Sequence, residues 1–222
     1  MAMLSDEFYE RYWREYGSES CGDDPTIGER LARLKTIVRQ LGPGSVIGDV
    51  GCGSGLFTAA LDSWGFDAYG CDVAAEAIQL ARKAYPKGKF EVNAVGGRLP
   101  WPDQFCDAIW CTEVLEHVFD VYGFMAEVSR ALKPNGLFVI TTPYLGVIKN
   151  VMIALFRFSA HYNPWLSHIR FFDKRSLSDC LKRGGFHVNE WLGIGRFWPL
   201  YKSFFVIARK VIQPSGRPKI IG

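Results

Sequence analysis

The residues with the clearest chemical potential are two aspartates near a glycine-rich segment. Asp49 lies two residues before Gly51, where glycine begins to recur at every second position, and Asp72 follows the next apolar run. A carboxylate so close to the glycines repels a pyrophosphate and attracts an ammonium or sulfonium group. A second carboxylate at the end of a strand can accept hydrogen bonds from ribose hydroxyls. The simplest ligand for both acids is an adenosine that carries a positive charge.

These side chains need a scaffold that presents them at one edge, and the apolar pattern predicts such a scaffold. Strand-like runs alternate with helical periodicity, which is typical of a parallel sheet covered by helices. Strands are expected at 45–50, 68–71, 89–94, 107–111, 137–141, 186–192 and 203–210. Helices are expected at 8–16, 28–41, 55–64, 74–85, 122–132 and 174–183, with residues 133–136 (Lys-Pro-Asn-Gly) forming a turn. The pattern predicts a doubly wound α/β fold.

Two features depart from simple alternation. Residues 144–172 form a long aromatic insertion after the fifth strand, and the link 193–201 is too short for a crossover helix, so the last two strands should be antiparallel neighbours. We expect one domain over 1–222, built from an N-terminal helical segment (1–44), a ligand-binding core (45–143), the insertion (144–172), the last helix and strands (173–213) and a tail (214–222).

Several motifs in order resemble the class I S-adenosylmethionine-dependent methyltransferases. They are Asp49-Val50-Gly51-Cys52-Gly53-Ser54-Gly55, Gly70-Cys71-Asp72-Val73, Leu99-Pro100-Trp101-Pro102-Asp103, Phe105-Cys106-Asp107, Glu113-Val114-Leu115-Glu116-His117-Val118 and Leu132-Lys133-Pro134-Asn135-Gly136-Leu137. The resemblance implies a Rossmann-like sheet of about seven strands, mostly parallel with an antiparallel last strand, and S-adenosylmethionine as the cofactor.

The resemblance also assigns the cofactor contacts. Gly51, Cys52 and Gly53 would pack against the methionine portion by their backbone, Asp49 would orient its amino group, Asp72 would bind the ribose, and Val73 would cover the adenine. The family often has an acid after the third strand, where this chain has Asn93-Ala94, so Asn93 and Ala94 are the candidates for the adenine amino group. Cys111, at the end of the fourth strand, completes the predicted cofactor set.

Three histidines are candidates for the base that a hydroxyl acceptor requires. His117 follows the fourth strand and is the first candidate, although a histidine that only orders the start of a helix fits the sequence equally well. His161 and His168 lie in the insertion, which in this family commonly covers the active site. An aromatic loop that packs on the domain's own core is the competing interpretation. His187 falls on a predicted strand and is expected to be structural.

Charge is divided unevenly along the chain. Residues 1–144 hold 13 Lys and Arg against 20 Asp and Glu, whereas residues 145–222 hold 13 against 3. A basic, aromatic final third suggests an anionic partner, such as a small-molecule or glycolipid-type acceptor or the face of a membrane, although a solvated surface is the simpler explanation of the charge alone. Nucleic acid is not expected. The stretches 143–150, 168–172, 193–196 and 200–203 also resemble methyltransferases encoded with bacterial surface-polysaccharide or glycolipid genes.

The remaining expectations concern location and alternatives. The chain shows no secretory signal and no apolar run long enough to span a bilayer, so a cytoplasmic protein is predicted. The six cysteines lack metal-ligand spacing, so neither a disulfide framework nor a metal site is expected. The activity expected is methyl transfer, with oxygen as the favoured acceptor atom. The alternatives are a dinucleotide-dependent oxidoreductase and a non-catalytic protein that binds S-adenosylmethionine or docks on membranes.

Overall fold

A computed structural model describes residues 3–17, 24–94, 96–162 and 168–211 of the chain. The predicted tail 214–222, Cys21 and the middle of the insertion (163–167) lie outside these residues. The elements in chain order are α1 (Met3–Tyr16), α2 (Ile27–Val38), β1 (Val46–Val50), α3 (Leu56–Ser63), β2 (Asp67–Asp72), α4 (Ala75–Ala84), β3 (Lys89–Val92), β4 (Cys106–Thr112), the 3-10 turn η1 (Leu115–His117), α5 (Val121–Ala131), β5 (Leu132–Pro143), α6 (Val147–Phe156), α7 (Phe158–His161), α8 (Lys174–Arg183), β6 (Phe186–Ile194) and β7 (Ser203–Lys210).

The strands form one seven-stranded sheet in the order β3-β2-β1-β4-β5-β7-β6. β1 pairs in parallel with β2 and β4, while β7 lies antiparallel between β5 and β6. This confirms the predicted fold class, including the antiparallel last strand. Because β1, β2 and β4 are parallel, their carboxyl ends share one edge of the sheet. The strand order reverses between β1 and β4, and open α/β sheets bind ligands at such a point.

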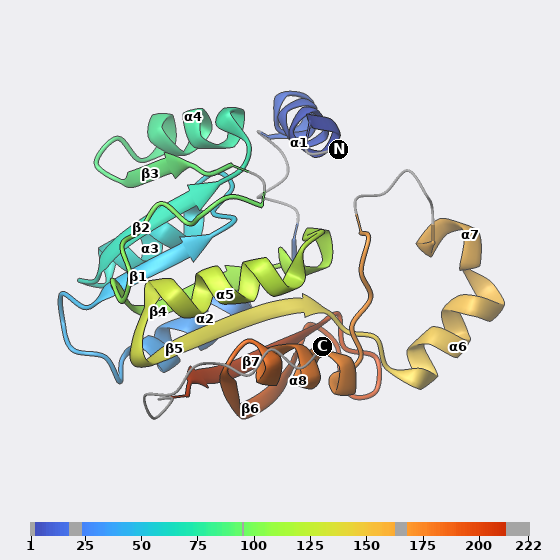
Figure 1. Cartoon of the computed structure of the whole chain (residues 1–222). Coiled ribbons are helices and arrows are strands. Elements are labelled where there is room, and N and C mark those ends of the chain that lie inside the picture. Colours follow the sequence, from blue (N-terminus) through green and yellow to red (C-terminus); the bar gives the residue numbers. More distant parts are fainter. Residues whose placement is uncertain (1–2, 18–23, 95, 163–167, 212–222) are drawn as a thin grey trace.

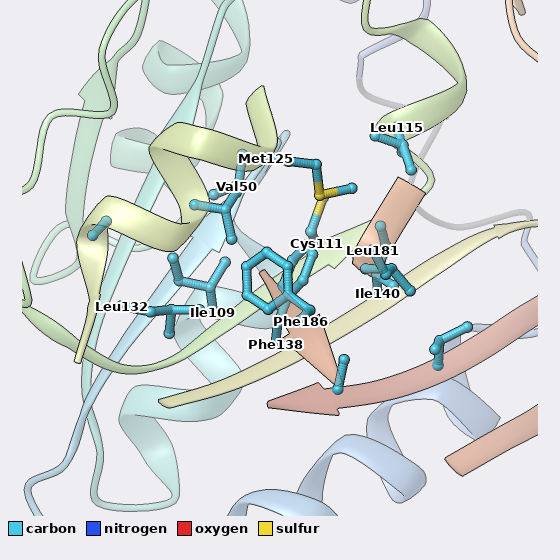
Figure 2. Close-up of a cluster of buried hydrophobic side chains, with 14 of the residues drawn as sticks. Val50, Ile109, Cys111, Leu115, Met125, Leu132, Phe138, Ile140, Leu181 and Phe186 are labelled. Carbon is cyan, nitrogen blue, oxygen red and sulfur yellow. The ribbon is translucent and has the colours of Figure 1, made fainter. Parts of the chain in front are cut away.

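Helices cover both faces of the sheet, and each face has its own apolar core. On one face α5 and α8 pack against the strands, and Figure 2 shows Met125, Phe138, Leu181 and Phe186 of this core. On the other face α2 and α3 contribute Leu34 and Leu61. Burial on both faces explains why β1 and β4 read as nearly continuous apolar runs.

The structure corrects the sequence interpretation in two places. Residues 133–136 lie within β5 rather than in a free turn, because Leu132 pairs with Cys106 and Leu137 pairs with Ala108. The extra residues bulge out of the ladder, and Asn135 takes a positive φ of 61° there. The insertion contains α6 and α7, which no periodicity had indicated, and Figure 1 shows them projecting away from the sheet.

Candidate functional site

The glycine loop between β1 and α3 adopts a backbone that only glycine supports easily. Gly51 and Gly53 have φ values of 72° and 53°. A Cβ atom would lie 2.3 Å from Val114 at the first position and 2.7 Å from Trp13 at the second. Both the backbone conformation and the close neighbours therefore exclude a side chain. The amides of Gly51 and Cys52 donate to the Cys71 carbonyl at 2.8 and 3.0 Å, which fixes the loop against the end of β2.

Asp72 ends β2 and lies directly beside this loop. Its Oδ2 atom accepts from the Gly53 amide at 2.9 Å, and its Oδ1 atom accepts from the Ala74 amide at 3.0 Å. Burial raises the pKa of Asp72, and these two backbone donors oppose the rise. A carboxylate oxygen can accept more than one hydrogen bond, so the group can hold the loop and still receive ribose hydroxyls.

The other residues predicted to face the nucleoside gather at the same edge. The backbone N–H of Asn93 donates to the Asp72 backbone carbonyl at 2.7 Å. Asn93 and Val73 are half-buried, while Ala94 is exposed. Their contact with adenine stays a prediction. Cys111 and Cys52 are 0% and 7% exposed, and both thiols pack within apolar clusters. These two cysteines can therefore meet a cofactor here only through backbone atoms.

Asp49 is fully buried behind the loop. Its Oδ2 atom accepts from the Thr58 hydroxyl at 2.6 Å, whereas its Oδ1 atom is buried without a hydrogen-bond partner among the described residues. Desolvation raises the pKa of Asp49 to about 7, against the opposing effect of Thr58. An orphaned buried acceptor is the kind of group that an ammonium donor satisfies. The loop and its acids therefore fit a cationic adenosine cofactor.

The raised pKa of Asp49 has a measurable consequence for the protein without cofactor. A carboxyl that ionises at 3.8 when unfolded and at about 7 when folded retains an extra proton in the folded state between these values. Its stabilising contribution is therefore fully present below pH 3.8 and is lost as the pH rises through 7. Between these pH values, Asp49 should lower the free energy of unfolding of the parent by up to about 1.4 kcal/mol per pH unit. Asp49→Asn should remove this contribution, which unfolding in urea at several pH values would measure. A parent and an Asp49→Asn variant with parallel stability curves from pH 4 to 7 would contradict this assignment.

Helix α1 covers the glycine loop, which the sequence did not indicate. The Trp13 ring lies against Gly53, and the Tyr9 ring lies 5.9 Å from that of His117. The Glu10 carboxylate accepts from the amides of Ala75 and Glu76 at 2.6 and 3.1 Å, at the start of α4. Such amides are the unsatisfied donors of a helix N-terminus, and a carboxylate stabilises them. Helix α1 is thereby fastened across the loop.

The structure brings His117 and His168 together at the end of β4. Their ring centroids are 4.9 Å apart. The Glu116 carbonyl accepts from the amides of Ile169 and Arg170, both at 3.0 Å, and the Arg170 guanidinium donates to the carbonyls of Val118 and Phe119. These contacts hold the end of the insertion against η1. His161 lies on α7, where its ring contacts that of Tyr162, and it is close enough to His168 to help lower the pKa of that ring, after desolvation as the main cause.

Two glutamates beside the histidines were missed as site residues, although the spacing Glu113-x-x-Glu116-His117 was visible. Glu116 is 1% exposed, and its Oε2 atom accepts from the Thr142 hydroxyl at 3.2 Å. Its Oε1 atom has no hydrogen-bond partner among the described residues and lies 3.9 Å from His117 Nε2. Burial, and then the neighbouring Glu113, raise its pKa well above the usual carboxyl range. Glu116, His117 and His168 offer ligand atoms within 4.8 Å of one another. Such a set can exchange protons and could also hold a divalent cation.

Glu113 anchors this region to the rest of the fold. Its Oε1 atom accepts from the Thr141 hydroxyl at 2.9 Å and pairs with the buried Arg30 guanidinium at 3.0 Å. Arg30 also pairs with Asp24 at 2.9 Å. Because Glu113 has a positive φ of 51°, these contacts hold a strained residue at the point where β4 turns into η1.

Comparisons with known proteins agree with this geometry. Residues 48–140 match a family described as methyltransferase domain. The chain is 34% identical over 96 residues to a ubiquinone biosynthesis O-methyltransferase of Rickettsia typhi, covering 42% of this chain and 39% of that protein. It is 27% identical over 146 residues to a probable S-adenosylmethionine-dependent methyltransferase of Mycolicibacterium smegmatis, covering 66% and 53%. The chain therefore spans about half the length, or less, of these curated relatives.

The fold has a counterpart with the cofactor product bound. Magnesium protoporphyrin IX methyltransferase of Synechocystis, solved with S-adenosylhomocysteine, superposes with a TM-score of 0.68 at 15% identity over 92% of this chain and 99% of that one. That likeness concerns the fold alone. The matched domain over residues 48–140, the ordered motifs and the sheet topology together support the predicted likeness of the chain to the class I S-adenosylmethionine-dependent methyltransferases.

Proposed function

We propose that the protein transfers a methyl group from S-adenosylmethionine to an oxygen of an anionic small-molecule or lipid-linked acceptor. The observation that carries the choice of oxygen is the pair His117 and His168 beside the buried Glu116, at the edge where β4 ends. A hydroxyl acceptor must lose a proton as it gains a methyl group, and a histidine at this position can accept it. A relative named as an O-methyltransferase supports the same choice.

Different residues bind the cofactor and accept the proton in such a reaction. The cofactor, when bound, supplies an activated methyl group on its sulfonium sulfur. The loop from Gly51 to Gly53, with Asp72, holds the cofactor, and α1 limits water access to the loop. The imidazole of His117 takes the proton of the acceptor hydroxyl as the oxygen–methyl bond forms. His168 is held beside it by the Glu116 carbonyl contacts, and burial lowers the pKa of His168, which favours its neutral, proton-accepting form.

A turnover assay tests the proposal directly. Isotope-labelled S-adenosylmethionine would be incubated with the protein and a panel of nucleotide sugars, glycolipids and small phenols, and the products analysed by mass spectrometry. The expected product carries the label on an oxygen, in equal amount to S-adenosylhomocysteine. A label found on nitrogen or carbon would contradict the proposed acceptor atom.

The positive charge of residues 145–222 leads to a separate prediction about the affinity for the acceptor. Arg196 is exposed, and Arg196 and Lys202 both lie close enough to Lys149 to lower its pKa, after burial as the main cause. Arg196→Gln should raise the acceptor KM about fivefold, because an exposed cation near an anion contributes about 1 kcal/mol. The parent should lose acceptor affinity as the salt concentration rises. Arg183→Gln, on exposed Arg183 at the end of α8, is the matched control.

Arg170 is expected to behave differently from Arg196. Its guanidinium already donates to two carbonyls of the loop after η1, so Arg170→Gln should loosen that loop and lower turnover in addition to acceptor affinity. If the KM values of both variants are unchanged and insensitive to salt, the acceptor is neutral and this part of the proposal is wrong.

A further inference from the structure

Helix α6 is apolar apart from Lys149 and Asn150 and yet has no buried residue. Its sequence, VIKNVMIALF, contains a single charged side chain. Val147, Leu155 and Phe156 are 80%, 70% and 77% exposed. A helix that is apolar all round is normally found inside a protein or a membrane. A contiguous apolar surface of this kind marks an interaction site.

The apolar surface continues on both sides of the helix. One side faces α7 across an open groove of about 660 Å³, lined by Val147, Asn150, Val151, Ala154, Phe158 and Tyr162. The other side carries Ile148 and Met152, which are 51% and 46% exposed. Neither side packs against the sheet, and Figure 1 shows α6 and α7 standing away from the body of the molecule.

A second apolar element lies next to the start of α6. The Lys149 ammonium donates to the carbonyls of Tyr144 and Tyr201 at 3.1 and 3.0 Å, which fastens the helix to the loop between β6 and β7. In that loop Phe197 and Trp198 are 71% and 69% exposed. We call the exposed side chains of α6 together with Phe197 and Trp198 the α6 surface. Aromatic rings of this kind are typical of protein surfaces that enter the boundary of a bilayer.

The charged side chains of the insertion are all of one sign. Residues 144–172 contain Lys149, Arg157 and Arg170 and no aspartate or glutamate. Arg157 is exposed at the end of α6, and Arg196 is exposed beside Phe197. A second copy of this chain would bring these cations against one another, whereas an anionic lipid surface complements them.

We propose that the α6 surface binds the face of an anionic phospholipid bilayer, with α6 lying in the interface and its apolar side chains among the acyl chains. None of the helices in the described part of the chain is long and apolar enough to cross a membrane, so the contact is peripheral. This inference goes beyond the proposed reaction and does not depend on the identity of the acceptor. On this proposal the site formed by Glu116, His117 and His168 belongs to a protein that binds a membrane surface.

Vesicle flotation without cofactor or acceptor tests the inference. The parent should float with vesicles of phosphatidylcholine and phosphatidylglycerol, more weakly with phosphatidylcholine alone, and less as salt rises. Leu155→Glu and Phe156→Glu should each weaken binding at least tenfold, because a buried apolar side chain is replaced by a charge. Arg157→Gln should weaken it about fivefold. Val211→Glu and Arg183→Gln are the controls, and they should leave vesicle binding unchanged. Val211 follows the end of β7 and Arg183 ends α8, both at the edge of the sheet opposite to the α6 surface.

Three results would overturn the inference. They are a parent that does not float with anionic vesicles, a Leu155→Glu variant that floats as well as the parent, and a Val211→Glu variant that is equally impaired. Light scattering after size exclusion adds a separate readout. A dimer that Leu155→Glu converts to a monomer, with no vesicle binding by the parent, would assign the α6 surface to a second copy of the chain. None of these results bears on methyl transfer, which is measured separately with soluble acceptors.

Discussion

Replacement of His117 by alanine should lower turnover about a hundredfold or more, while the Kd for S-adenosylhomocysteine changes less than threefold. The reason is the position of the ring after β4, next to His168 and Glu116 and away from the Asp72 side of the loop. Turnover would be measured with the panel acceptor that reacts fastest, and cofactor affinity by calorimetry. The separation of the two effects distinguishes a base from a residue that orders the cofactor loop.

His187→Ala is the matched control, because His187 lies exposed on β6 and should retain parental turnover. Equal turnover in His117→Ala and the parent would show that His117 has a structural role only. His168→Ala would then become the decisive variant, since its ring is the nearest alternative proton acceptor and burial favours its neutral form. His161 is the third of the predicted candidates, and the contact of its ring with Tyr162 favours a role in shaping the insertion.

Asp72→Ala should weaken binding of S-adenosylmethionine more than tenfold. We expect two hydrogen bonds from ribose hydroxyls to the carboxylate to be lost, each contributing about 1.5 to 3 kcal/mol. The structure adds a second cause, because the variant also loses the acceptors for the amides of Gly53 and Ala74. Calorimetry gives the affinity, and thermal unfolding shows whether the loop alone or the whole fold is affected.

Asp67→Ala on the same strand provides the comparison. Asp67 begins β2 and forms a surface ion pair with Lys89, so its removal should cost little stability and no cofactor affinity. Unchanged cofactor affinity in a folded Asp72→Ala protein would contradict the assignment of Asp72 to the ribose.

The sequence predicted those features of the fold and the site that depend on residues close together in the chain. The run into Asp49, the glycines after it and the acid at Asp72 are short-range features, and the sheet topology places them at one edge. The short link before β7 fixed the antiparallel hairpin in the same way. These predictions rest on strand length, turn chemistry and chain connectivity, which neighbouring residues determine.

The sequence did not predict those features that depend on contacts between residues far apart in the chain. Helix α6 resembled a loop because Lys149 and Asn150 interrupt its apolar run, and the lysine is accommodated by carbonyls more than 50 residues away in the chain. The approach of His168 to His117 depends on backbone hydrogen bonds to Glu116, for which no residue type gives a signal. The docking of α1 over the loop depends on the Trp13 ring against Gly53 and on the Glu10 carboxylate at the start of α4, which lie far apart in the chain from the residues they contact.

The most direct test of the central claim is a calorimetric titration of the parent protein with S-adenosylhomocysteine and, separately, with NAD. Both ligands contain an adenosine ribose for Asp72, but only the first brings an ammonium group to the side of the loop where an Asp49 oxygen has no partner among the described residues. We expect one S-adenosylhomocysteine to bind per chain, NAD to give no binding heat, and Asp72→Ala to abolish most of the first signal. Binding of NAD without binding of S-adenosylhomocysteine would contradict the assignment of the chain as a methyltransferase.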